Sequence, residues 1–521
     1  MALDPSTRSG PCEIAAALWG AVIWRALTCV TALLTVACAT AGGVSQSPPP
    51  SPAATRSEQR VADHFERIRG EPPALRAFLR AMPKGADLHT HLSGAVYAES
   101  YIRWAAELPL CVDLPTHAFV AGRSAAPAAP AAGAPAQVTC EHPGSQRPAA
   151  DALHDPALYR SLIDALSTRF WQGARNAGHY QFFDAFTKFG PVAREGREAP
   201  EFVARSVAEV VQRAALQNVL HLELMMAFGQ VFDEPPGVTD GDAGFAAART
   251  ALTADGLPER LAERRRWLDG VEKATRTLLR CDQADPMEGC RVSLRYLSYA
   301  LRGLAPERVF AQALFAFELA AADPRVVGVN MVMPEDWFIP MRDYDLHMRM
   351  YAFLQRQYPS VDIALHAGEL TLGLVPPEQL GLHVRQAIEI GGAKRIGHGT
   401  DVMHDADAAG LLREMAARRI AVEISLSSSD LILGVRGIRH PLRQFLRAGV
   451  PVVIATDDEG VARSDLTNEY QRAVEEQDLS YAELKTISRN SIEFSFLPAA
   501  EKARLRQELE AALAAFEAAI R

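Results

Sequence analysis

The stretch Val361–Leu370 reads VDIALHAGEL and decides the fold. Its first half is a short apolar run of mostly β-favouring residues, and its second half contains His366, two small residues and Glu369. This pattern predicts a buried strand with polar side chains at its carboxyl end. Barrel enzymes place their chemistry at such strand ends, because the strand holds the backbone while the following loop faces the substrate.

Seven further runs of the same kind occur along the chain, mostly separated by segments of helix length. They are Lys84–Leu92, Val219–Met225, Val292–Leu301, Val326–Met333, Arg395–Thr400, Ala421–Ser429 and Pro451–Asp458. Eight strands that alternate with helices favour an α/β fold, a parallel (β/α)8 TIM barrel, over a doubly wound open sheet. The segment Val96–Gln217 predicts a mostly helical insertion after the first strand. Within it, the Ala- and Pro-rich segment Gly122–Pro135 predicts a surface loop.

The N-terminal region has the composition of an export leader. Two apolar runs, Ile14–Trp24 and Ala26–Ala37, are separated by Arg25. We interpret residues 1–38 as a signal peptide or lipoprotein leader and expect a bacterial periplasmic or cell-envelope protein. An uncleaved transmembrane anchor is the less favoured alternative, because Arg25 would lie in the middle of the membrane.

Cys38 is the candidate for lipidation, which would tether the protein to a membrane. Thr35 departs from the aliphatic residue usual three places before a lipidated cysteine, so ordinary cleavage nearby is a close alternative. Residues 39–56 are rich in Gly, Ser, Pro and Ala and predict a disordered linker. The folded domain is therefore expected over residues 57–521, beginning with helical periodicity that Pro72 and Pro73 interrupt.

The remaining cysteines are compatible with export. Outside the leader the chain contains Cys111, Cys140, Cys281 and Cys290, which allow three disulfide pairings. The two local pairs, Cys111 with Cys140 and Cys281 with Cys290, would close short loops. Disulfides are expected in an oxidising compartment. Four free thiols are expected instead if residues 1–38 do not direct export.

The charge of the chain argues against one class of partner. The 521 residues have a formal net charge of -9, and the only basic block is Arg264–Arg266. This balance argues against binding to a nucleic-acid backbone and favours a small-molecule partner. The oligomeric state is not indicated by the sequence.

Polar side chains gather at the carboxyl ends of four predicted strands. They are His89 and His91, His366 and Glu369, His398, and Asp457 and Asp458. Each has an ordinary alternative, such as a surface histidine pair or an aspartate that caps the next segment. Together, three imidazoles and a carboxylate at one rim of a barrel are typical of a zinc site with an added water.

The motifs around these residues resemble the adenosine deaminases and their secreted growth-factor relatives. The matching segments, in the family's order, are Pro83–Lys84 with His89–Leu92, then His366–Glu369, Arg395–Gly399 and Thr456–Asp458. The resemblance extends from about Pro83 to the C-terminus and is interrupted by the Ala- and Pro-rich insertion.

The resemblance implies one zinc ion per chain, held by His89, His91, His366 and Asp457. It implies that Glu369 protonates the purine ring nitrogen next to the attacked carbon. His398 would orient and help deprotonate a metal-activated water, and Asp458 would hydrogen-bond the imidazole half of the purine. The expected reaction converts adenosine or deoxyadenosine to inosine or deoxyinosine plus ammonia. This chemistry needs a nucleophile that a metal can generate at neutral pH and an acid that enters the reaction protonated, which burial favours.

Two positions depart from the family pattern and are candidate substrate contacts. Ser93 replaces the aspartate that contacts the ribose, and Met333 replaces a glycine whose backbone approaches the purine. A side chain at position 333 would reshape the base pocket. A deaminase of another aminopurine, namely a free base, a modified adenosine or a nucleotide, is therefore an alternative. A non-catalytic nucleoside-binding protein is a second alternative, disfavoured by the intact Glu369 and His398.

Overall fold

The computed structural model describes residues 56–124, 138–169, 177–193, 199–228 and 234–520. These residues all belong to one compact unit, Ala54–Arg521. The predicted leader 1–38, the linker up to residue 55 and most of the Ala- and Pro-rich loop lie outside the described residues. Within the described part of the chain, no helix is both long and apolar enough to cross a membrane.

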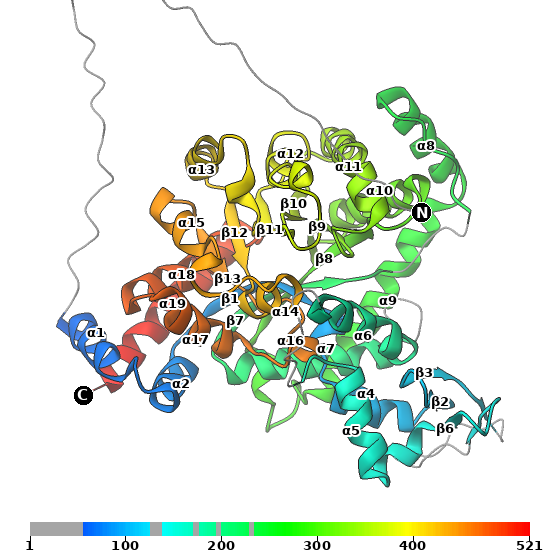
Figure 1. Cartoon of the computed structure of the whole chain (residues 1–521), viewed down its shortest axis with the longest axis horizontal. Helices are drawn as coiled ribbons and strands as arrows, with labels where there is room; N and C mark the ends of the chain where they lie inside the picture. Colours follow the sequence, from blue (N-terminus) through cyan, green and yellow to red (C-terminus); the bar gives the residue numbers. More distant parts are fainter. Residues whose placement is uncertain (1–55, 125–137, 170–176, 194–198, 229–233, 521) are drawn as a thin grey trace, which may run out of the picture. The chain divides into compact units, whose positions relative to one another are not determined.

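The core of this unit is an eight-stranded parallel barrel (Figure 1). Its strands, in order around the sheet, are β1 (Gly85–His91), β7 (Val219–Met226), β8 (Ser293–Leu301), β9 (Val326–Val332), β10 (Asp362–Ala367), β11 (Arg395–His398), β12 (Ala421–Ile424) and β13 (Val452–Ile454). The sheet closes between β1 and the residues after β13. There, His91 N donates to Asp457 O at 3.0 Å, and Asp457 N donates to His89 O at 2.8 Å. The predicted (β/α)8 barrel is confirmed, and the open doubly wound sheet is excluded.

The helices surround the barrel and form part of the insertion after β1. They are α1 (Arg56–Ile68), α2 (Pro72–Ala81), α3 (Leu92–Ala95), α4 (Ala98–Ala106), α5 (Pro156–Ala165), α6 (Ala177–Ala193), α7 (Pro200–Leu216), α8 (Asp242–Ala254), α9 (Leu257–Leu278), α10 (Pro306–Ala322), α11 (Phe338–Gln357), α12 (His383–Glu389), α13 (Ala408–Ala417), α14 (Leu426–Leu433), α15 (Leu442–Ala448), α16 (Glu459–Ala462), α17 (Leu466–Gln477), α18 (Tyr481–Glu493) and α19 (Ala499–Ala519). Short 3₁₀ turns are η1 (Ala149–Leu153), η2 (Glu288–Arg291), η3 (Pro377–Gln379), η4 (Val402–His404) and η5 (Gly437–Arg439). Pro72 begins α2, where a proline without an N–H is tolerated, so the predicted interruption between the first two helices is confirmed.

Two predicted strands are much longer than the observed ones. In the run Pro451–Asp458, the strand β13 covers only Val452–Ile454. The run Ala421–Ser429 was expected to be a strand throughout, but β12 ends at Ile424 and α14 begins at Leu426. Serines 427 to 429 lie inside this helix and are buried. An apolar run at a strand-to-helix junction has no internal signal for the change, because both elements are buried here.

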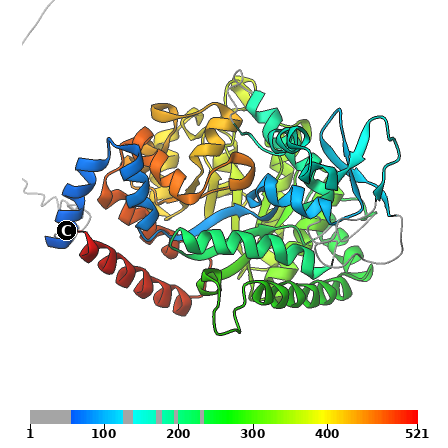
Figure 2. The same ribbon diagram turned by 90° about the horizontal axis from the view of Figure 1, so that it is seen from below.

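The insertion after β1 is not only helical. It contains a three-stranded antiparallel sheet of β3 (Ala118–Ala121), β2 (Leu110–Asp113) and β6 (Gln146–Pro148). A further short pair joins β4 (Arg123–Ser124) to β5 (Val138–Thr139). Figure 2 shows the three-stranded sheet at one end of the unit, away from α1 and α19. Strands of two to four residues are too short to show an alternating pattern, so the sequence did not predict them.

The described residues contain two disulfide bonds, and neither lies in a strand of the barrel. Cys111 on β2 is bonded to Cys140, and Cys281 is bonded to Cys290. Of the three alternative pairings that the four cysteines allow, the structure has the one made of the two local pairs.

The C-terminal helix contributes to one end of the barrel core. Leu505, Leu509 and Leu513 of α19 are spaced by four residues, so they form one apolar stripe. This stripe packs with Ala86 and Leu88 of β1. Because these β1 residues precede His89, α19 leaves the carboxyl ends of the strands free to form a site.

Candidate active site

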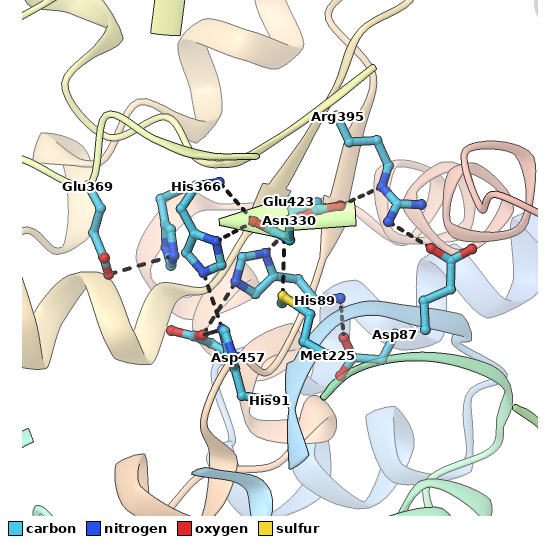
Figure 3. A network of polar contacts seen from close by, with 12 residues as sticks. Asp87, His89, His91, Met225, Asn330, His366, Glu369, Arg395, Glu423 and Asp457 are labelled. Atoms are coloured by element: carbon cyan, nitrogen blue, oxygen red, sulfur yellow. Dashed lines mark hydrogen bonds and ion pairs between the residues drawn. The ribbon is translucent and has the colours of Figure 1, made fainter. Parts of the chain in front are cut away.

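Four side chains from three strand ends converge on one point. His89 and His91 lie two residues apart on β1, and therefore on the same side of the strand. His366 comes from β10, and Asp457 follows β13. One ligand atom of each residue lies within 4.8 Å of the others (Figure 3). Asp457 Oδ1 is 3.3 Å from His89 Nε2 and 3.2 Å from His91 Nε2, and the Nε2 atoms of His91 and His366 are 3.2 Å apart.

This cluster has the properties of a cation site. His89 Nε2 is buried and makes no hydrogen bond of acceptable geometry within the described residues. Burial opposes a positive charge on His89, but Asp457 and Glu423 outweigh it and raise its pKa to about 10. The pKa of Asp457 lies well below its ordinary value despite burial, because His89 and His91 surround it. Nitrogen and carboxylate donors that face one point suit a borderline divalent metal, so the residues present fit such an ion.

The outward nitrogens of two histidines are held by buried acceptors. His89 Nδ1 is 2.7 Å from Glu423 Oε2, and His366 Nδ1 is 2.9 Å from Asn330 Oδ1. Such contacts fix the ring orientation and tautomer, so that Nε2 of each ring faces the centre. Figure 3 shows both acceptors behind the imidazoles.

The acceptor of His89 belongs to a buried chain of charges. Arg395 Nε donates to Glu423 at 2.5 Å, and Arg395 Nη2 lies 2.7 Å from Glu223. All three side chains are almost completely buried. Sequence reasoning did not assign a role to any of them. The available signal was a charged residue in each of three predicted strands, at the start of one and within the other two, where an unpaired buried charge is costly.

A proton donor and a proton acceptor lie beside the cluster. His398 Nε2 is 3.6 Å from Glu369 Oε1, and both residues join Asp457 in a second close group. Burial, followed by the charge of Asp457, raises the pKa of Glu369 well above its ordinary value. Burial lowers the pKa of His398 to about 4. Burial therefore favours the protonated form of the Glu369 carboxyl and the neutral form of the His398 imidazole.

Glu335 accepts hydrogen bonds from the backbone at Glu369. Its carboxylate accepts from Gly368 N at 3.0 Å and from Glu369 N at 2.8 Å. His383 Nδ1 lies 2.5 Å from the same carboxylate, and Arg302 Nη2 lies 3.8 Å from it. Glu335 was not among the predicted site residues, because it follows the end of β9 by three residues and its partners are distant in sequence.

A cavity of about 270 Å³ opens above these groups. The predicted residues that line it are His91, Ser93, Met333, His366, Glu369, His398, Asp457 and Asp458, while His89 is not among its lining residues. Phe182, Phe183 and Phe186 of α6 form part of its wall. A Cβ atom at position 94 would lie 1.6 Å from Asp458 Oδ1, so glycine there gives the Asp458 carboxylate its place in the cavity.

Met333 places a side chain in the cavity wall, as the sequence predicted. Its φ is 95°, a backbone conformation that glycine adopts easily and a methionine adopts with strain. The end of its side chain lies against Gly303, where a Cβ atom would be 2.8 Å from Met333 Cε and 3.3 Å from Trp337. The backbone conformation that suits glycine is therefore present, but the space is filled.

The sequence matches one family model and several curated proteins. The model described as adenosine deaminase matches residues 154–512, more than half of the chain. An aminodeoxyfutalosine deaminase of Streptomyces avermitilis is 32% identical over 277 residues, which cover 52% of this chain and 68% of the relative. An adenosine deaminase of Shewanella loihica is 39% identical over 121 residues, but these cover only 23% of this chain and 36% of the relative.

Solved structures show the same fold at low sequence identity. An amidohydrolase of Burkholderia ambifaria, solved with bound Zn, has a TM-score of 0.53 and 19% identity, over 85% of this chain and 94% of that chain. An Arabidopsis protein, ADAL, solved in complex with IMP, also has a TM-score of 0.53 and 19% identity, over 84% of this chain and 99% of that chain. Identities this low support the likeness of fold alone.

Proposed function

Because the chain belongs to the adenosine deaminase family, we propose that it is a zinc-dependent hydrolase that converts adenosine or deoxyadenosine to inosine or deoxyinosine and ammonia. One observation carries this proposal. A buried three-histidine, one-aspartate cluster lies beside a carboxyl whose pKa burial raises, at the base of a cavity. A hydrolytic deamination needs these two features side by side.

Zinc is the proposed metal because of the donor set. Three imidazole nitrogens and one carboxylate oxygen match the ligands that zinc prefers, and a relative of the same fold was solved with bound Zn. When bound, such an ion lowers the pKa of a coordinated water to around 7. We assign the metal to His89, His91, His366 and Asp457.

The neighbouring side chains perform the proton transfers in this proposal. Glu369 donates its proton to the ring nitrogen next to the attacked carbon, so that negative charge does not accumulate on the purine. His398 is neutral at neutral pH and accepts a proton from the attacking water. Asp458 lies in the cavity wall and hydrogen-bonds the imidazole half of the purine.

The test is ammonia release from adenosine by purified, zinc-loaded protein. We expect turnover to be lost on dialysis against a chelator and restored by Zn²⁺, with about one zinc per chain by elemental analysis. Glu369→Gln should lower kcat by about 10³-fold, since general acid catalysis contributes about 10²–10⁴-fold. Glu378→Gln, at an exposed position after β10, is the matched control and should leave kcat unchanged. Folded, metal-loaded protein that is inactive on every aminopurine would contradict the proposal.

A deaminase of a different aminopurine is the second candidate. Ser93 removes the carboxylate expected to contact a ribose, and Met333 fills part of the cavity. The named relatives include an aminodeoxyfutalosine deaminase as well as an adenosine deaminase, so the family model does not select the substrate. A clear preference for adenosine over every other aminopurine would remove this candidate.

We also propose that the protein is exported. The two disulfides support this assignment, because such bonds persist in oxidising compartments. Cell fractionation together with mass spectrometry of the mature N-terminus tests it, and would distinguish lipidation at Cys38 from ordinary cleavage. Full-length protein with an intact N-terminus in the cytoplasm would contradict it.

A further inference from the structure

The acidic and basic side chains that line the cavity are carboxyl groups and imidazoles. Glu369, Asp457 and Asp458 contribute carboxyl groups, and three histidines complete the ionisable set. Among the described residues that line the cavity there is no lysine and no arginine. An anionic group on a substrate would therefore meet no cationic side chain among the described lining residues.

Two basic side chains on elements next to the cavity are engaged in other contacts. Arg302 is buried, and its guanidinium donates to Met333 O at 2.7 Å and to His366 O at 3.1 Å. Arg302 does not line the cavity, and its guanidinium forms an ion pair with Glu335. On α6, Lys188 is paired with Asp184 at 2.7 Å. Neither group is available to hold a phosphate or a carboxylate in the cavity.

The wall of the cavity is apolar and extends towards solvent. Three phenylalanines of α6 face the ends of β8 and β9, where Leu301 and Met333 lie. Trp337 continues this wall outward and is 43% exposed, and the neighbouring Phe338 is 74% exposed. The apolar surface therefore runs from the reacting groups to the mouth.

The orientation of the purine follows from the chemistry of the site. The carbon that bears the amino group must lie at the metal ligands and Glu369, which form the inner end of the cavity. The ring nitrogen that carries the sugar is at the opposite end of the bicyclic base, so the sugar and its substituents point towards the mouth. Trp337, which is 43% exposed, lines this part of the cavity, and the Met333 side chain lies next to it, packed into the space beside Gly303.

Met333 is a specificity-determining residue by this geometry. A methionine at a φ of 95° is strained, and strain of this kind at a binding site is retained where the side chain has a use. A flexible thioether is well suited to contact an irregular apolar group.

We propose that the substrate is an uncharged aminopurine nucleoside whose sugar carries an apolar group, and that Met333 and Trp337 contact this group. The inference rests on the proposed function, because it places the purine by the position of the deaminating groups. A phosphate or carboxylate on the sugar is disfavoured, since it would lie against this apolar wall, where the described lining residues include no lysine and no arginine.

The test compares three substrates of the zinc-loaded protein: adenosine, 5′-deoxy-5′-methylthioadenosine and adenosine 5′-monophosphate. Burying one methylene is worth about a fourfold change in binding, so the methylthio compound should exceed adenosine in kcat/KM by about tenfold. The monophosphate should fall about 10³-fold below adenosine. A monophosphate within tenfold of adenosine, or a methylthio compound slower than adenosine, overturns the inference and leaves the proposed function standing. Failure of all three substrates overturns the proposed function itself.

A pair of variants tests the role of Met333. Met333→Ala should abolish the preference for the methylthio compound over adenosine, while Met333→Leu should retain most of it. Met403→Ala, at a half-exposed methionine that does not line the cavity, is the control and should leave the ratio unchanged. A general loss of folding would lower the rates with both substrates and would not move their ratio. An unchanged ratio in Met333→Ala overturns the assignment of this residue.

Binding of the products gives a second measurement that does not depend on turnover. Inosine 5′-monophosphate should give no thermal stabilisation at a concentration at which 5′-methylthioinosine stabilises the protein. Equal stabilisation by the two compounds would contradict the proposed selectivity.

Discussion

Replacing Glu335 by glutamine should weaken both the fold and catalysis, without touching any group that reacts. The Glu335 carboxylate holds the backbone N–H groups of Gly368 and Glu369, and it faces His383 and Arg302. Glutamine keeps the size of the side chain but removes the charge and turns one acceptor into a donor. That donor would then face a backbone N–H, His383 or the Arg302 guanidinium.

The magnitude follows from the electrostatics of the buried carboxylate. Burial disfavours the charged form of Glu335, but Arg302 and His383 outweigh it and lower its pKa from 4.5 to about 2. At about 1.4 kcal/mol per pKa unit, this corresponds to about 3 kcal/mol of stability. Because the folded-state pKa is depressed, this contribution is present above pH 4.5 and is lost as the pH falls towards 2. We therefore expect Glu335→Gln to lower the free energy of unfolding by about 3 kcal/mol at pH 7, out of about 5–15 kcal/mol for a typical domain.

The rate of catalysis should also fall. Without the hydrogen bonds to the Glu335 carboxylate, the backbone of Gly368 and Glu369 shifts, and the proton donor Glu369 shifts with it. Displacement of a catalytic group by about 1 Å typically costs about 10² in rate, so kcat should fall by that factor while KM changes little. The basic limb of the pH–rate profile should persist, since Glu369 itself is intact. This last readout separates a positioning role from the loss of the acid.

The assay combines urea unfolding, followed by two spectroscopic probes, with kinetics on adenosine under saturating zinc. Glu378→Gln makes the same chemical change at an exposed position of the following loop and should behave as wild type. If Glu335→Gln unfolds within about 0.5 kcal/mol of wild type and retains kcat within a factor of two, the carboxylate does not hold the loop in the way the hydrogen bonds indicate.

The remaining predictions concern the metal ligands, the acid and the disulfides. Glu423→Gln should weaken zinc binding by about 10- to 100-fold, as measured by competition with a chelator, whereas Glu414→Gln on α13 should not. Activity should fall as the pH rises through the raised pKa of Glu369, because the acid is active only while protonated; a kcat/KM that keeps rising across this range would contradict its role. Serine replacements of Cys281–Cys290 and Cys111–Cys140 should lower stability by about 3 and about 4 kcal/mol respectively, since the second pair closes the longer loop of 29 residues against 9; equal shifts in thermal midpoint would refute the loop-entropy reasoning.

The barrel and the convergent site residues were predictable because strand ends follow a local rule. An apolar run that ends in His366 or Asp457 marks a carboxyl end wherever it occurs, and parallel strands of a barrel bring those ends to one rim. The register between distant strands did not have to be known. Alternation along β1 sufficed to put His89 and His91 on the same side.

The supporting residues were harder to predict, because each depends on a partner that is far away in sequence. Asn330 and Glu423 look like polar interruptions of apolar strands until the imidazoles in front of them are placed. Glu335 lies in a loop, and its role depends on backbone N–H groups rather than on a side-chain motif. Periodicity contains no information about such pairs. The small sheet of the insertion was missed for a different reason, the shortness of its strands.

The closure of the barrel explains why the two classes differ. The hydrogen bonds that join β1 to the segment after β13 run between His89, His91 and Asp457, which are themselves the proposed ligands. Forming the barrel therefore forms the metal cluster, and no loop has to adopt a particular conformation first. The side chains of the cavity wall are not fixed by the closure of the barrel in this way. Met333, Trp337 and the phenylalanines of α6 come from loops and from the insertion. Substrate choice can consequently change through these residues while the reacting groups keep their geometry.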